Sequence, residues 1–269
     1  MDCIYYDKWK LLEKTKLPLY ILKTENDVFK QCAMDMANVI EENNAKDDIS
    51  VIVAPIGPIG QYPIFVKYVN DTKLSLEKTH FVLMDGYVEN DKDLPYNHRL
   101  SLRRRMDELL FNQIDEELKP KASNIIGVEA EDVLSVNRKI DKLGKIDFCV
   151  AGIGINGHIG FNEQKNLNAD DYLAQATTRI LDLSIESRLI SAINNYKGAL
   201  CEIPTRGITL GLKEMMSANK ITAYCFREWH NSVVKRVCCE SPSGNFPATI
   251  LQLHKNSSLY AHESIVSLI

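Results

Sequence analysis

Residues 146–163 read IDFCVAGIGINGHIGFNE, and this stretch decides the fold. Its first six residues are mostly apolar and predict a buried strand. The remainder holds four glycines within nine residues, at 152, 154, 157 and 160, which predicts a loop whose backbone can approach a ligand closely. In parallel α/β sheets, ligands bind outside the carboxyl ends of the strands. This stretch therefore predicts both a sheet of that kind and the position of a ligand site.

Outward from this stretch, apolar runs and amphipathic segments alternate along the chain. The alternation predicts an α/β fold with a doubly wound, mostly parallel sheet. No linker, low-complexity segment or repeat interrupts it, so we expect a single domain over residues 1–269. The expected strands are residues 19–22, 49–54, 81–84, 146–151, 221–226 and 259–262, and the expected helices are residues 25–42, 62–69, 100–112 and 233–239.

Composition excludes several classes of protein. The chain has 32 Lys and Arg against 36 Asp and Glu, a net charge of −4, and its hydrophobic fraction of 45% is typical of a globular protein. Its one dense basic cluster, Arg103–Arg105, is short, so we expect no nucleic-acid partner. No apolar run is long enough for a membrane span, and no signal-peptide layout begins the chain. Seven cysteines show no zinc spacing, so we expect reduced thiols in the cytoplasm.

Three loops are expected at the carboxyl edge of the sheet: residues 55–60, 85–99 and 152–163. Asp85 begins the second loop, directly after an apolar strand. A carboxylate in that place is partly desolvated, which raises its pKa and suits it to act as a general base. The alternative is that Asp85 only caps a turn or a helix.

The third loop carries side chains suited to proton transfer. His158 is the side chain that best exchanges protons near neutral pH, while Glu163 can orient it and Asn156 can fix the imidazole or a hydroxyl. The glycines at 152, 154 and 157 match a dinucleotide-binding fingerprint. That fingerprint belongs after a first strand and before a helix, and neither holds here, so we expect no NAD.

The first loop, Gly57-Pro58-Ile59-Gly60, precedes an expected helix. Backbone N–H groups at such a position can bind an anion. The loop lacks the lysine and the Ser or Thr of a phosphate-binding loop, and a tight turn explains the glycines equally well.

Several segments resemble the glucosamine-6-phosphate deaminases. GINGHIGFNE at 154–163 resembles the signature loop of this family, and MDGY at 84–87 resembles its Met-Asp-Glu-Tyr motif. PTRGITLG at 204–211 and FPATILQLH at 246–254 match later segments in the same order. The resemblance spans residues 30–260. The related 6-phosphogluconolactonases share the fold but usually lack the Phe-Asn-Glu ending of the signature loop.

The resemblance implies a modified Rossmann-type three-layer sandwich and an aldose–ketose isomerisation coupled to loss of ammonia. The implied reaction converts glucosamine-6-phosphate to fructose-6-phosphate in amino-sugar catabolism, downstream of N-acetylglucosamine, with no metal or organic cofactor. Asp85 would move a proton between C2 and C1. His158 would assist ring opening, with Glu163 as its partner and Asn156 positioning it.

The expected phosphate site departs from the family pattern. Ile59 stands where a hydroxyl is typical, the lysine of a Gly-Ser-x-Lys element is lost within residues 227–231, and Gly86 replaces a glutamate. Arginines are the candidate replacements: Arg188, Arg206, Arg227 and the cluster Arg103–Arg105. The substrate-binding residues expected from the loops and the resemblance are Gly57, Gly60, Gly86, Gly154, Gly157, Arg188 and Arg206.

These departures leave other functions open. The same chemistry can serve another sugar phosphate, and a histidine in a glycine-rich loop also suits lactone hydrolysis. A third alternative is a module that binds a sugar phosphate without converting it. The family includes monomers, dimers and hexamers, so the resemblance leaves a homo-oligomer open.

Overall fold

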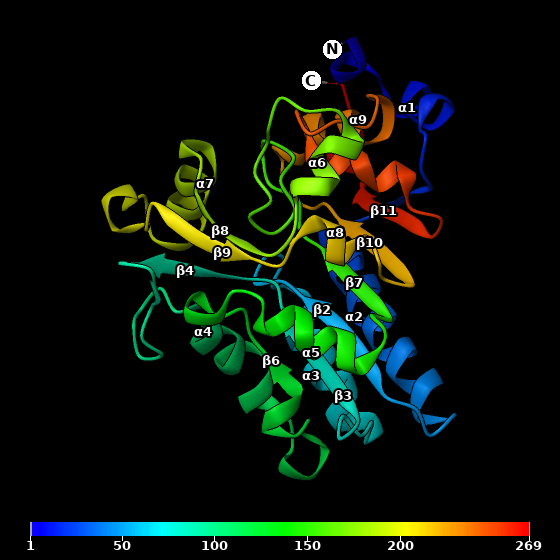
Figure 1. Ribbon diagram of the computed structural model, residues 1–269. Coiled ribbons are helices and arrows are strands. Elements are labelled where there is room, and N and C mark those ends of the chain that lie inside the picture. Colours follow the sequence, from blue (N-terminus) through cyan, green and yellow to red (C-terminus); the bar gives the residue numbers. More distant parts are fainter. Residues whose placement is uncertain (1, 269) are drawn as a thin grey trace.

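The main sheet has seven strands, all parallel, in the order β1-β11-β10-β7-β2-β3-β6. It is seen here in a computed structural model that describes residues 2–268. Figure 1 shows the sheet running through the molecule with helices on both of its faces. The strands are β1 Leu19–Leu22, β2 Ser50–Ala54, β3 Thr79–Leu83, β6 Ile125–Ile126, β7 Phe148–Ala151, β10 Lys220–Tyr224 and β11 Ser257–His262.

Alternate side chains of each central strand enter two different cores. Ile52 and Ala54 of β2 join the core formed with α2 and α3, whereas Val51 and Val53 join the core on the opposite face. This period of two buries both faces of the sheet, as a parallel sheet requires. The predicted three-layer α/β fold is confirmed. The helices that cover the two faces are α2 Glu25–Asn44, α3 Gln61–Thr72 and α4 Leu102–Leu109 on one, and α1 Lys8–Lys14, α5 Ser135–Leu143, α8 Leu212–Met215 and α9 His230–Cys239 on the other.

A second, antiparallel sheet of four strands was not predicted. Its order is β5-β4-β9-β8, and Figure 1 shows it extending to one side of the main sheet, next to α7. The chain turns at Met84 straight into β4, so the expectation of a loop was wrong over residues 85–93 and held only for residues 94–99. The partner of β4 is β9, far along the chain, and local sequence does not reveal such a pairing. The bounds are β4 Asp85–Glu89, β5 Lys92–Asp93, β8 Arg179–Asp182, β9 Arg206–Thr209, α6 Ala169–Gln175 and α7 Ile185–Asn195.

Each of the six predicted strands is present, with ends that differ by a few residues. The helix expected over residues 100–112 is shorter: α4 ends at Leu109 and a 3₁₀ turn follows. None of the helices in residues 2–268 is long and apolar enough to cross a bilayer. The 3₁₀ helices are Asp2–Tyr5, Phe111–Gln113, Glu116–Leu118, Ala122–Asn124, Ala130–Asp132, Leu200–Glu202, Pro247–Leu253 and Glu263–Val266.

The strand order reverses between β2 and β7. The strands that follow β2 in the chain, β3 and β6, lie on one side of it, whereas β10 and β11 lie beyond β7. The connections that leave β2 and β7 therefore diverge and open a crevice at their carboxyl ends, which is where ligands bind in open α/β sheets. The loops 55–60 and 152–163 both leave strands at this crevice.

Candidate active site

A cavity of about 170 Å³ lies at this crevice. Its walls come from the loops after β2, β7 and β10, from the beginning of β4, and from α4 and α7. The lining side chains with acid–base or hydrogen-bonding chemistry include Asp85, Arg105, His158, Ser187 and Arg227. The cavity therefore collects residues that are far apart in the chain, from Pro55 to His230.

Asp85 stands in this wall without a partner. It is the first residue of β4, and no donor among residues 2–268 hydrogen-bonds its carboxylate. Burial raises the pKa of Asp85 from 3.8 to about 7, because the charged form loses its hydration without gaining a counter-charge. Near neutral pH such a carboxyl group both accepts and returns a proton, as a general acid–base catalyst must.

The side-chain amide of Asn156 holds His158, and the hydrogen bond to Glu163 determines which way this amide faces. Asn156 Nδ2 donates to Glu163 Oε2 at 2.8 Å, and a carboxylate only accepts. Asn156 Oδ1 therefore faces His158 Nδ1, 2.7 Å away, and Nδ1 must carry the proton. In the neutral ring, Nε2 is then an unprotonated base, and it has no hydrogen-bond partner in the described part of the chain. The imidazole lines the cavity.

Ser187, in the first turn of α7, joins the same network. Its hydroxyl donates to Glu163 Oε1 at 2.6 Å and lies 3.0 Å from His158 Nδ1 as a second acceptor. Ser184, the N-cap of α7, accepts from Asn156 Nδ2 and donates its hydroxyl to Ser187. Sequence reasoning missed both serines. Their spacing is typical of a helix start, but it carries no sign that the helix begins beside His158.

Burial keeps the imidazole neutral, and the network acts in the opposite direction. Burial lowers the pKa of His158, and the negative charge of Glu163 opposes this effect. Glu163 Oε2 lies 3.8 Å from Nδ1, so the carboxylate acts on the ring mainly through Asn156 and Ser187. Asn156 and Glu163 are both buried. The arrangement can therefore fix one tautomer of His158 and stabilise the imidazolium that forms when Nε2 takes a proton.

Two glycines of the signature loop are required by close contacts. A Cβ on Gly154 would lie 2.0 to 2.5 Å from atoms of the His158 ring, so any side chain there would displace the imidazole. Gly157 has a φ of +81°, which L side chains rarely adopt, and it packs against Phe246. Gly154 lines the cavity, and Gly157 shapes the loop around it.

The other three glycines of the expected site are placed differently from one another. Gly57 lines the cavity. Gly60 immediately precedes α3, where a Cβ would collide with the ring of Phe29, so its glycine serves packing. Gly86, the second residue of β4, lines a separate cavity beside Asp93. The structure thus gathers only part of the expected glycine set around His158.

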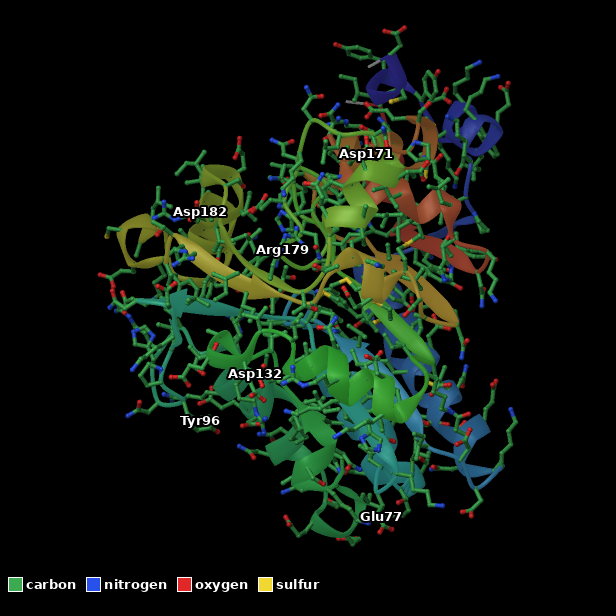
Figure 2. The ribbon with its side chains drawn as sticks, viewed as in Figure 1. Glu77, Tyr96, Asp132, Asp171, Arg179 and Asp182 are labelled. Carbon is green, nitrogen blue, oxygen red and sulfur yellow. The ribbon has the colours of Figure 1, made fainter. Side chains whose placement is uncertain are left out.

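Arg188 and Arg206 do not line the cavity. Arg188 donates to the carbonyl of Ile203. Arg206 forms an ion pair with Asp91, and its Nε lies 3.7 Å from Asp182, which Figure 2 labels at the outer end of β8. Their guanidinium groups are occupied elsewhere, so the structure does not bring these two arginines to His158.

His230 lies in the segment where the family lysine is lost. Its Nδ1 accepts the backbone N–H groups of Phe226 and Arg227, both at 2.9 Å, so Nε2 donates to the carbonyl of Ile153. Burial lowers the pKa of His230 to about 3. This ring lines the cavity without charge, and it occupies backbone donors near the start of α9.

The described residues offer no cluster for a metal. Across residues 2–268, His, Cys, Asp and Glu side chains nowhere gather in groups of three or more suited to a metal ion. The donors around the cavity are an isolated carboxylate, an imidazole with one free nitrogen, hydroxyls and guanidiniums. Such a set fits proton transfer on a polar organic substrate.

Comparison with known proteins agrees with the motifs. No family model matches the chain. A glucosamine-6-phosphate deaminase from Clostridium perfringens is 28% identical over 254 residues, which covers 93% of this chain and 99% of the relative. The sequence resemblance therefore extends well beyond the signature loop.

Solved structures share the fold. A monomeric glucosamine-6-phosphate deaminase superposes with a TM-score of 0.82 at 22% identity, over 94% of this chain and all of that one. A 6-phosphogluconolactonase from Thermotoga maritima gives a TM-score of 0.65 at 15% identity, covering 91% and 98%. The chain is therefore similar to glucosamine-6-phosphate deaminases over most of its length, and it has the fold that the 6-phosphogluconolactonases share.

Proposed function

We propose that the protein is a sugar-phosphate aldose–ketose isomerase and deaminase that converts glucosamine-6-phosphate to fructose-6-phosphate and ammonia. One observation carries the proposal: an unpartnered carboxyl group, Asp85, and an unprotonated ring nitrogen, His158 Nε2, line the same cavity. Curated relatives of that name support it over most of the chain.

His158 would open the sugar ring. Its Nε2 accepts the proton of the anomeric hydroxyl O1, the C1–O5 bond breaks, and the imidazolium returns the proton to O5. The product is the open-chain aldehyde, with no net change in protons. The carboxylate of Glu163, linked to the ring by Asn156 and Ser187, stabilises the imidazolium during this exchange.

Asp85 would then carry out the isomerisation. As a carboxylate it removes the proton from C2, and one proton moves from the substrate ammonium group to O1, which leaves an enolamine. Asp85 returns its proton to C1 and produces a protonated imine at C2. Water adds to this imine and releases ammonia, leaving the ketose. A pKa near 7 suits a group that acts first as a base and then as an acid.

The test is product formation by the purified protein. We expect equal amounts of ammonia and fructose-6-phosphate from glucosamine-6-phosphate, with far less ammonia from glucosamine at the same concentration. Absence of ammonia with glucosamine-6-phosphate over a range of pH would contradict the proposal.

Lactone hydrolysis is the second candidate, because a neutral His158 with a free Nε2 can also activate water. The structural similarity to a 6-phosphogluconolactonase favours including it. Hydrolysis of 6-phosphogluconolactone faster than its spontaneous rate, without ammonia release from glucosamine-6-phosphate, would favour this function. Binding of either sugar phosphate without turnover would indicate a sensing module.

A further inference from the structure

We propose that Arg105 and Arg227 form a two-guanidinium subsite that binds the phosphate group of the substrate. The identity of the sugar rests on the proposed function, whereas the anion subsite rests on the contacts of the two arginines. Arg105 projects from α4 and Arg227 from the loop between β10 and α9, and both line the cavity that holds Asp85 and His158.

Neither guanidinium has an acidic partner. Within residues 2–268, no carboxylate oxygen lies within 4.0 Å of Arg105 or Arg227, although each side chain is partly buried. The neighbours of Arg105 in the basic cluster differ: Arg103 pairs with Asp107 and Arg104 with Glu108. Arginines that line a cavity without a counter-ion are suited to receive an anionic ligand.

Most of their donors are free. Arg105 Nη2 donates to Asn195 Oδ1 at 3.0 Å, and the guanidinium carbon of Arg227 lies 5.0 Å from the centre of the Phe226 ring. A guanidinium has five N–H donors, so both groups retain several for a ligand. Burial lowers the pKa of Arg227; Glu25 opposes this, and the positive charge of Arg105 adds to it. The two cations therefore repel each other, and a bound anion would relieve that repulsion.

The other groups that could bind an anion near this cavity are unsuited or already hydrogen-bonded. His230 occupies the N–H groups of Phe226 and Arg227, and Ile59 has no hydroxyl to offer. Arg188 and Arg206 are bound elsewhere. Among the cationic side chains, only Arg105 and Arg227 are found in the described lining of the cavity. A phosphate monoester, a compact dianion with three terminal oxygens, matches two planar guanidiniums.

The experiment is calorimetric titration in an Asp85→Asn background, which we expect to bind sugar phosphates without consuming them. The ligands are glucosamine-6-phosphate, inorganic phosphate and glucosamine. Arg105→Gln and Arg227→Gln should each weaken binding of glucosamine-6-phosphate and phosphate roughly 10-fold or more, and the double variant further. Arg104→Gln and Arg206→Gln are the matched controls, with expected changes of less than about twofold because their ion pairs with Glu108 and Asp91 are exposed and contribute little. Arg227→Lys keeps the charge and should lose less affinity than Arg227→Gln.

Three results would overturn the subsite: unchanged affinity for both phosphorylated ligands in the two glutamine variants, an equal loss of glucosamine affinity, or equal losses in the control variants. Failure of the Asp85→Asn protein to bind either phosphorylated ligand would overturn it as well. The proposed function is tested separately, by ammonia release from glucosamine-6-phosphate with the wild-type protein. Selective loss of phosphate binding in the arginine variants supports the subsite even if that assay is silent.

Discussion

Asp85 and His158 line one cavity but are held in opposite ways. No donor among the described residues contacts Asp85, whereas His158 Nδ1 has two acceptors, Asn156 and Ser187, backed by Glu163. Burial favours the neutral form of both groups. The difference fits the two proposed tasks: a base that serves both C2 and C1 needs freedom to move, whereas ring opening needs one fixed tautomer.

Removing the unpartnered carboxyl group of Asp85 should have the largest effect on activity. Asp85→Asn keeps the shape but cannot accept the C2 proton, so we expect kcat for ammonia release to fall by about 10³-fold or more. Asp91→Asn, at an exposed carboxylate paired with Arg206, is the matched control and should keep nearly full activity. Substantial turnover by Asp85→Asn would remove Asp85 from the proposed mechanism.

Disturbing the hydrogen bonds around His158 Nδ1 should lower kcat less than Asp85→Asn does, because Nε2 remains in place. In Glu163→Gln the new amide can also donate, so the orientation of Asn156 and the tautomer of His158 are no longer determined. We expect kcat to fall by about 10²-fold, and nitrogen NMR of His158 to show a mixture of tautomers.

Glu240→Gln, which alters a partly buried pair with Arg236 outside the cavity lining, is the control for this change. An unchanged tautomer together with unchanged kcat would show that Glu163 does not act through Asn156.

Ser187→Ala tests the second acceptor of Nδ1. It removes one donor to Glu163 and one contact to the imidazole, so we expect about a 10-fold loss of kcat with little change in KM. Ser217→Ala removes an exposed hydroxyl outside the cavity lining and should leave kcat and KM unchanged. An increase in KM with unchanged kcat would assign Ser187 to substrate binding instead.

The pH profile reports on Asp85 in the free enzyme. The carboxyl group must be ionised to remove the C2 proton, and burial raises its pKa to about 7. We therefore expect kcat/KM to rise with pH, with a midpoint near 7. A midpoint near 4 would mean that the carboxylate is well hydrated and that the cavity does not desolvate it.

The smallest expected effect is on the free energy of unfolding, which Asp85→Asn should increase. The folded pKa of Asp85 lies above its ordinary value of 3.8, so the native state binds more protons than the unfolded state between about pH 4 and 7. This contribution to the free energy of unfolding falls as pH rises through that window. Asp85→Asn should therefore be more stable than wild type by about 1–2 kcal/mol at pH 8, and the difference should vanish near pH 3. Equal denaturation midpoints at both pH values would contradict the burial of a charged Asp85.

Six of the seven strands of the main sheet were predictable, because each is a largely apolar run with its own boundaries; β6, only two residues long, was not predicted. The second sheet was not, because β4 pairs with β9, and Asp85 in β4 lies opposite Thr209. Arg188 and Arg206 illustrate the same limit. Their charge and position in the sequence suggested an anion site, but the contacts with Ile203 and Asp91 direct them elsewhere.

The sequence by itself determined the α/β class, the buried strand and glycine-rich loop of residues 146–163 and the grouping of Asn156, His158 and Glu163, because these depend on local patterns and short spacings. Only the tertiary structure decided that α7 brings Ser187 to His158, and that Arg105 and Arg227 enter the same cavity. The physical reason is that hydrogen bonds and charge interactions act over a few ångströms, and only folding sets the distance between groups remote in the chain.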